Sequence, residues 1–99
     1  MTIRPVIFRR QARMEFDEAA LWYEAHRRGL GARITFAVDS VINSAALNPD
    51  RHPRVFADVH EGLVSGFPYC VYYRQEHGRI LVIGIFHASR DPSIWQSRG

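Results

Sequence analysis

The sequence has no lysine and only one cysteine among its 99 residues. A single thiol, Cys70, excludes an internal disulfide, and its place in an apolar segment favours a packed side chain over a nucleophile. The histidines are scattered along the chain without the paired spacing that is typical of a zinc site. The sequence therefore predicts no metal, no cofactor and no redox chemistry.

Long apolar runs are also missing. The segment 80–86 is far shorter than the roughly 20 residues that a membrane helix needs, and no signal segment opens the chain. A hydrophobic fraction of 46% in 99 residues is enough for one compact core, and the chain is too short for two. We expect a single domain over residues 1–99, soluble and cytoplasmic, with no membrane contact.

Because lysine is absent, all 13 positive side chains other than histidine are arginines. Arginine suits bidentate contact with phosphate or carboxylate. Codon usage in a GC-rich genome also replaces lysine by arginine everywhere, and we favour that explanation of the absence. The formal net charge of +3 favours an acidic partner or a nucleic-acid surface without identifying either.

Hydrophobic periodicity predicts one strand, two helices and then three strands. Apolar residues recur at helical spacing through residues 10–28 and 30–47. Gly29 separates the two helices and Asn48-Pro49 ends the second, so we expect an antiparallel helical hairpin. Strands are expected at residues 3–8, 59–64, 69–74 and 79–86, a polar loop at residues 49–54, and one helical turn at residues 93–95.

This β-α-α-β-β-β order indicates an α+β fold, a mainly antiparallel sheet with the helical hairpin packed on one face. The last strand is apolar on both faces and is expected inside the sheet. The opposite face of the sheet is expected to be open. Trp22 and Tyr23 are expected to pack against the sheet, and Trp95 either folds back on the domain or remains an exposed anchor.

His87 and Arg90, just beyond the last strand, are the candidate catalytic residues. Cleavage of RNA needs a base for the 2′-hydroxyl, a cation for the phosphorane charge and an acid for the leaving oxygen. His87 suits the base or the acid, and Arg90 suits the phosphate. In the structural alternative, His87 caps backbone groups at the strand end and Arg90 pairs with Asp91 or with an acid on a helix. Tyr69 is expected to neighbour His87.

A second basic group follows the helices and is a candidate binding site for a nucleic-acid backbone. It consists of Arg51, His52 and Arg54. Tyr72 and Arg74 share one face of their strand, so Tyr72 is the candidate for an exposed ring that stacks on bases. Arg74 ends its strand at the opposite end of the hairpin from the candidate catalytic residues. The alternative for each of these charged residues is an ordinary solvated side chain.

The final hairpin runs into His87-Ala88-Ser89-Arg90-Asp91-Pro92 and is preceded by Ala19-Ala20-Leu21-Trp22-Tyr23 and by Asn48-Pro49. Together these segments resemble the RelE/ParE superfamily of small bacterial toxins from type II toxin-antitoxin operons, over nearly the whole chain. The resemblance implies the same α+β fold. It also implies a partner, a small, acidic and partly disordered antitoxin that wraps the toxin and blocks it.

Members of the superfamily differ in their target. RelE-like members cut messenger RNA in the ribosomal A site with several basic residues, often including lysine, and a late arginine and tyrosine, whereas ParE-like members poison DNA gyrase without known hydrolytic chemistry. Here lysine is absent and no tyrosine follows Tyr73, although His52, His60 and His87 are possible substitutes. From the sequence we lean toward metal-independent cleavage of ribosome-bound RNA. Gyrase inhibition by binding is the alternative, and a toxin-like fold that only binds a partner is a third hypothesis.

Overall fold

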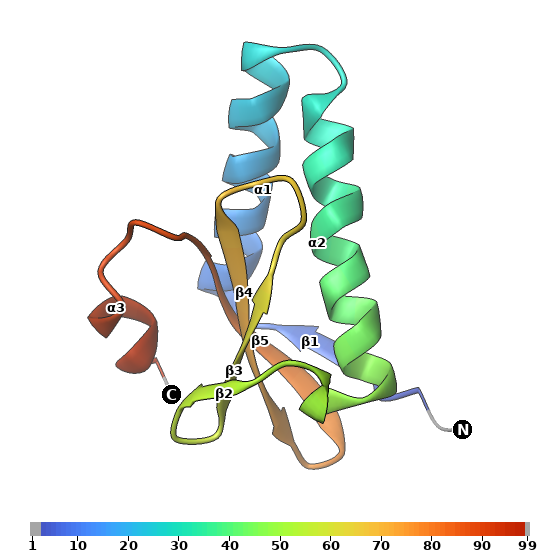
Figure 1. Ribbon diagram of the computed structural model, residues 1–99, viewed down its shortest axis with the longest axis vertical. Coiled ribbons are helices and arrows are strands. Elements are labelled where there is room, and N and C mark those ends of the chain that lie inside the picture. The colour runs from blue at the N-terminus through green and yellow to red at the C-terminus, as the bar shows by residue number, and fades with distance from the viewer. Residues whose placement is uncertain (1–2, 99) are drawn as a thin grey trace.

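The computed structural model describes residues 3–98 as one mixed α+β domain (Figure 1). None of the described helices is long and apolar enough to cross a membrane. In chain order the elements are β1 (Val6–Phe8), α1 (Arg10–His26), α2 (Leu30–Leu47), the 3₁₀ turn η1 (Pro49–Arg51), β2 (Arg54–Phe56), β3 (Val59–Leu63), β4 (Tyr69–Glu76), β5 (Arg79–His87) and α3 (Ser93–Gln96).

The sheet has the strand order β1-β5-β4-β3-β2. All its pairs are antiparallel except β1 with β5, which run parallel. The predicted α+β class is confirmed, and β5 lies between two strands as its apolar sequence indicated. Strand β2 was not predicted, and its first residue, Arg54, was expected to end a polar loop. Its three residues are all exposed, so its sequence has no alternation of buried and exposed positions from which a strand could be predicted.

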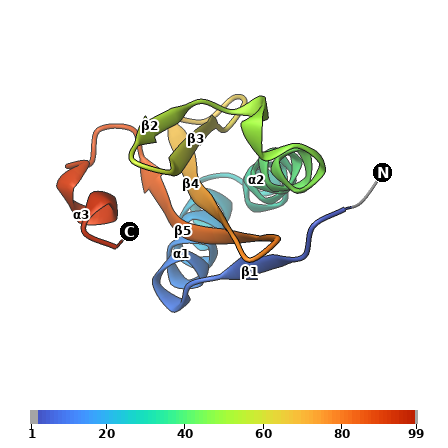
Figure 2. The ribbon, with the colours of Figure 1, turned by 90° about the horizontal axis from the view of Figure 1, so that it is seen from below.

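Helices α1 and α2 form the expected hairpin and cover one face of the sheet (Figure 2). The core between them is apolar throughout: Ile34 and Val38 of α2 are fully buried with Val71, Tyr73 and Val82 of the sheet. Gly29 lies between the two helices as predicted: α1 ends at His26, and Gly29, in a left-handed conformation with φ 93°, immediately precedes α2.

The carboxylate of Glu24 closes the turn between the two helices. It accepts hydrogen bonds from the backbone N–H groups of Gly29 at 3.0 Å and Gly31 at 3.0 Å, two donors that would otherwise lack partners at the start of a helix. Gly31 also lets the helices approach closely, since a Cβ at this position would lie 2.8 Å from the backbone oxygen of Ala20.

The second face of the sheet is covered by the segment after β5, so the expectation that it would be open is wrong. In Figure 2, α3 lies on the opposite side of β4 and β5 from α2. Trp95 of α3 is only 4% exposed and completes a second apolar cluster with Tyr72, Phe86 and Ile83. Of the two alternatives for Trp95, the structure shows the one in which it folds back on the domain.

Tyr72 is therefore buried, and the prediction of an exposed stacking ring is wrong. Its ring is 6% exposed and lies against the indole of Trp95. Its hydroxyl donates a hydrogen bond of 2.8 Å to Glu61 of β3. The face that Tyr72 shares with Arg74 was correctly identified, but a chain segment 23 positions downstream covers the Tyr72 end of it.

Candidate functional site

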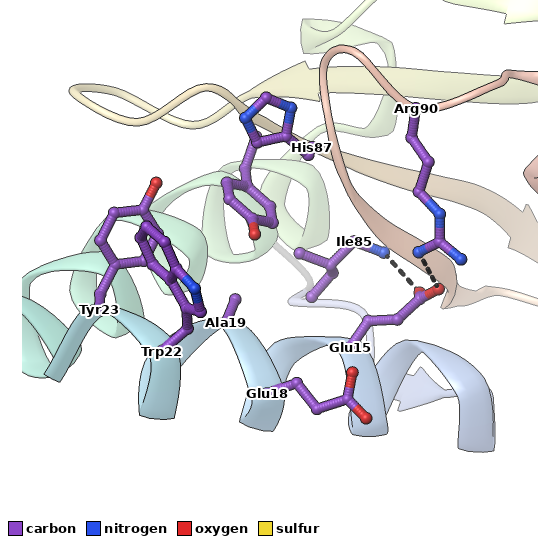
Figure 3. A pocket seen from close by; sticks show the side chains of 9 residues that line it. Glu15, Glu18, Ala19, Trp22, Tyr23, Ile85, His87 and Arg90 are labelled. Carbon is purple, nitrogen blue, oxygen red and sulfur yellow. Dashed lines mark hydrogen bonds and ion pairs between the residues drawn. The ribbon is translucent and has the colours of Figure 1, made fainter. Parts of the chain in front are cut away.

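A pocket of about 450 Å³ opens between α1 and the carboxyl end of β5 (Figure 3). We call it the aromatic pocket. Strand pairing places Tyr69, the first residue of β4, directly beside His87, the last residue of β5. The pocket is lined by Glu15, Glu18, Ala19, Trp22 and Tyr23 from α1, Tyr69 from β4, Ile85 and His87 from β5, and Arg90 from the segment that follows.

The turn after β5 determines which nitrogen of His87 carries a proton. The backbone N–H of Ser89 donates to Nδ1 of His87 at 3.1 Å, and the hydroxyl of Ser89 lies 2.8 Å from the same nitrogen. A backbone N–H can only donate, so Nδ1 is an acceptor, and in the neutral ring the proton is on Nε2. The imidazole of His87 is thus oriented by its own turn, as the structural alternative expected, while the side chain stays exposed.

Arg90 pairs with an acid on a helix, again as the structural alternative expected. Its guanidinium lies 3.4 Å from a carboxylate oxygen of Glu15 and 4.4 Å from the ring centroid of Phe86. The Arg90 side chain remains 45% exposed. Arg90 is therefore held at the edge of the aromatic pocket by one long ion pair and by stacking.

Glu15 is the most heavily bonded carboxylate near the pocket. Arg98 donates to both of its oxygens at 3.0 Å, and the backbone N–H of Ile85 donates at 3.1 Å. The Glu15 side chain is only 12% exposed. A buried carboxylate needs this number of donors, and Glu15 receives them from both the sheet and the last residues of the chain.

Three aromatic side chains form the wall of the pocket. Tyr23 meets Tyr69 and Trp22 edge to face, with ring centroids 6.0 Å and 4.9 Å apart. Burial raises the pKa of the Tyr69 hydroxyl, Tyr23 adds to the rise, and Arg90 opposes it, so this phenol carries its proton at neutral pH. Trp22 was expected to pack against the sheet, but it is 54% exposed and stacks on His26 one turn further along α1.

The predicted nucleic-acid residues do not join this pocket. Arg74 lies opposite Leu81 in the β4–β5 ladder, five positions from the Tyr69–His87 pair, which is roughly 16 Å along the strand. Arg74 also contacts Glu76 at 3.6 Å. The expectation that Arg74 and His87 lie at opposite ends of the hairpin is confirmed.

The basic loop lies near the Arg74 end as well. Arg51 and Arg54 are exposed there. His52 is half-buried, with Nε2 2.7 Å from the hydroxyl of Ser44 and its ring edge against Tyr73. Burial lowers the pKa of His52, and the nearby charges of Arg51 and His60 lower it further. The two groups of predicted site residues are thus separate surfaces.

Sequence reasoning missed Glu15, Glu18 and Tyr23 as members of the site. Glu15 falls between Ala12 and Ala19 at helical spacing, inside the stripe of residues that α1 buries. A carboxylate in such a stripe requires a buried partner. That position was the available signal, although it does not identify the partner.

The comparisons with known proteins agree with this fold. Residues 6–92 match the family model described as "ParE toxin of type II toxin-antitoxin system, parDE". A solved structure titled "Chromosomal ParDE TA system from P. aeruginosa" superposes with a TM-score of 0.73 over 86% of this chain and 96% of that chain, at 11% sequence identity. No curated protein sequence matches the chain. The chain belongs to the ParE toxin family of type II toxin-antitoxin systems.

Proposed function

We propose that this ParE-family toxin arrests growth by binding DNA gyrase through the aromatic pocket, and that it does not cut RNA. The observation that carries the proposal is the pair of hydrogen bonds from Ser89 to Nδ1 of His87. The lone pair of Nδ1 is used within the turn, and Nε2 of the neutral ring already carries a proton. A general base needs a free lone pair within reach of the substrate proton. His87 in this tautomer is a hydrogen-bond donor and is suited to recognition.

The charges around the pocket support the same proposal. Arg90, the residue expected to stabilise a phosphorane, is the one arginine among the described residues that line the pocket, whereas two carboxylates, Glu15 and Glu18, line it. Stabilising a developing phosphorane needs positive charge that is not already balanced. Arg51, Arg54 and Arg74 lie toward the other end of the hairpin, so these three arginines do not add positive charge beside His87.

Membership of the family implies a cognate antitoxin as the partner that neutralises the toxin. We propose that antitoxin binding and gyrase binding exclude one another, so that the complex of the two proteins is harmless. Metal-independent cleavage of ribosome-bound messenger RNA remains the competing hypothesis. It is favoured only by the exposure of His87 and Arg90 at one pocket.

One pair of assays separates the two functions. Purified gyrase is given relaxed plasmid, ATP and increasing amounts of the chain, and purified ribosomes with a defined messenger are incubated with the same preparation. We expect loss of supercoiling and intact messenger, with supercoiling restored by the antitoxin encoded beside the toxin. Unchanged supercoiling at saturating protein, together with new messenger 5′ ends at the A site, would reverse the proposal.

A matched variant sharpens the assay. In His87→Gln the side-chain amide still donates a hydrogen bond but has no acid–base function at neutral pH. A nuclease that relies on His87 for proton transfer loses roughly a hundredfold or more in rate. A binding toxin keeps most of its potency. We expect the second result, with His87→Ala weaker than His87→Gln.

A further inference from the structure

We propose that the aromatic pocket accepts one carboxylate side chain, aspartate or glutamate, presented by the toxin's protein target. The inference rests on the proposed function in taking gyrase as that target. The inference adds the chemistry of the contact: hydrogen-bond donors of the pocket bind one carboxylate of the target.

The pocket contains donors whose protons have no acceptor within the described chain. The hydroxyl of Tyr69 makes no hydrogen bond with residues 3–98, and its pKa is raised, so the proton is available to donate. Nε2 of His87 carries the other free proton, because Nδ1 accepts from Ser89. His87 is exposed and Tyr69 is only partly buried, so both donors can reach solvent and an acceptor from outside can take the place of water at them.

Arg90 supplies the positive charge. Its ion pair with Glu15 is long, 3.4 Å, whereas Arg98 binds both oxygens of the same carboxylate at 3.0 Å. Glu15 therefore keeps its shorter contacts with Arg98 if Arg90 turns toward a ligand, and Arg90 itself gives up only the long ion pair and its contact with the Phe86 ring. Figure 3 shows His87 and Arg90 above α1, with Ile85 beneath them.

The surroundings favour a protein carboxylate over a nucleic-acid backbone. Ala19, Ile85 and the exposed indole of Trp22 offer apolar contact to a methylene stem and no hydrogen-bonding pattern for a sugar. Glu18 also lines the pocket and makes no ion pair with the described residues. Its charge repels the neighbouring phosphates of a polyanion more than it repels one isolated carboxylate.

A binding assay with small probes tests the pocket without gyrase. The full-length labelled chain is titrated with N-acetylglutamate amide, N-acetylglutamine amide and the dinucleotide UpA while the Arg90 Nε–H and the Trp22 indole N–H resonances are followed. We expect saturable shifts with the glutamate probe only. Arg90→Gln abolishes the shift of the Trp22 indole N–H, whereas Arg79→Gln, the same change at an exposed position at the other end of β5, preserves both shifts.

Three outcomes overturn the inference. They are equal shifts with the glutamine probe, tighter binding of UpA than of the glutamate probe, and unchanged glutamate binding in Arg90→Gln. A dominant response to UpA assigns the pocket to RNA instead.

Gyrase inhibition then supplies the biological readout. Loss of a charged hydrogen bond typically weakens binding about tenfold or more, and loss of a neutral one about threefold. We expect the half-inhibitory concentration to rise by those factors in Arg90→Gln and Tyr69→Phe, with no change in Arg79→Gln. If the wild-type chain leaves supercoiling intact but the glutamate probe binds, the proposed function is wrong. The inference that the aromatic pocket binds a carboxylate is then still supported. Inhibition that is unaffected by Arg90→Gln and Tyr69→Phe overturns the pocket chemistry alone.

Discussion

The indole of Trp95 lies flat on the ring of Tyr72, with ring centroids 4.2 Å apart and planes inclined by 15°. Offset stacking of this kind adds to the burial of apolar area that both rings already gain. Phe56 of the edge strand β2 meets the same indole edge to face at 6.1 Å. The short helix α3 thereby covers the sheet face that the two long helices leave free, and its single tryptophan is its main apolar anchor.

Trp95→Ala should be among the most destabilising single changes in the chain. Removing a buried tryptophan typically costs about 3–5 kcal/mol in the free energy of unfolding. Equilibrium urea denaturation followed by circular dichroism measures the loss. The matched control is Trp22→Ala, because that indole is 54% exposed, and we expect it to change stability by about 1 kcal/mol or less. Equal losses in the two variants would contradict the anchoring role of α3.

Glu15 should couple more strongly to Arg98 than to Arg90. The Arg98 contact is bidentate, short and mostly buried, whereas the Arg90 contact is single, long and half-exposed. Double-mutant cycles with Glu15→Gln are expected to give a coupling energy of about 2 kcal/mol for Arg98→Gln and about 0.5 kcal/mol for Arg90→Gln. Coupling energies in the opposite order would show that Arg90 is the principal partner of Glu15.

Stability should fall as the solution is acidified through the range in which histidine titrates. Burial and the charges of Arg51 and His60 place the pKa of His52 in the folded chain below its unfolded value of 6.5. The unfolded chain therefore binds a proton more readily. The contribution of His52 to stability is complete above about pH 6.5 and declines as the pH falls toward the folded pKa. Urea denaturation at several pH values measures this slope.

The control for that experiment is a second histidine. His77 is 79% exposed in the tight turn between β4 and β5. His52→Gln should flatten the pH dependence between pH 5 and pH 7, whereas His77→Gln should leave the slope as it is. A slope that survives His52→Gln would assign the effect to another group.

Gly31→Ala should destabilise the helical hairpin even though alanine is the better helix former. The propensity gain is about 1 kcal/mol, but the new Cβ would lie 2.8 Å from the backbone oxygen of Ala20 and 3.0 Å from Glu24. Overpacking of this kind typically costs about 1–3 kcal/mol, so we expect a net destabilisation of up to about 2 kcal/mol. Thermal unfolding measures the net change. Asn43→Ala, at an exposed position on the same helix, is expected to be neutral or stabilising.

Much of the fold can be predicted from local patterns in the sequence. Periodic apolar residues define α1 and α2, Gly29 separates them, and the unbroken apolar run of β5 indicates an interior strand. The turn at residues 77–78 also sets the register of the hairpin as far as the Tyr73–Val82 pair. Such features are predictable because residues close in the chain determine them.

The sequence by itself determined the α+β class, the helical hairpin and the position of His87 and Arg90 at the end of the last strand, because periodicity, glycine and proline act over a few residues. Only the tertiary structure decided that Glu15 meets Arg90 and Arg98, partners 75 and 83 positions away, and that Trp95 covers Tyr72. Contacts of this range depend on how complete elements pack together. No local pattern records which acid faces which arginine, or which ring a terminal helix covers.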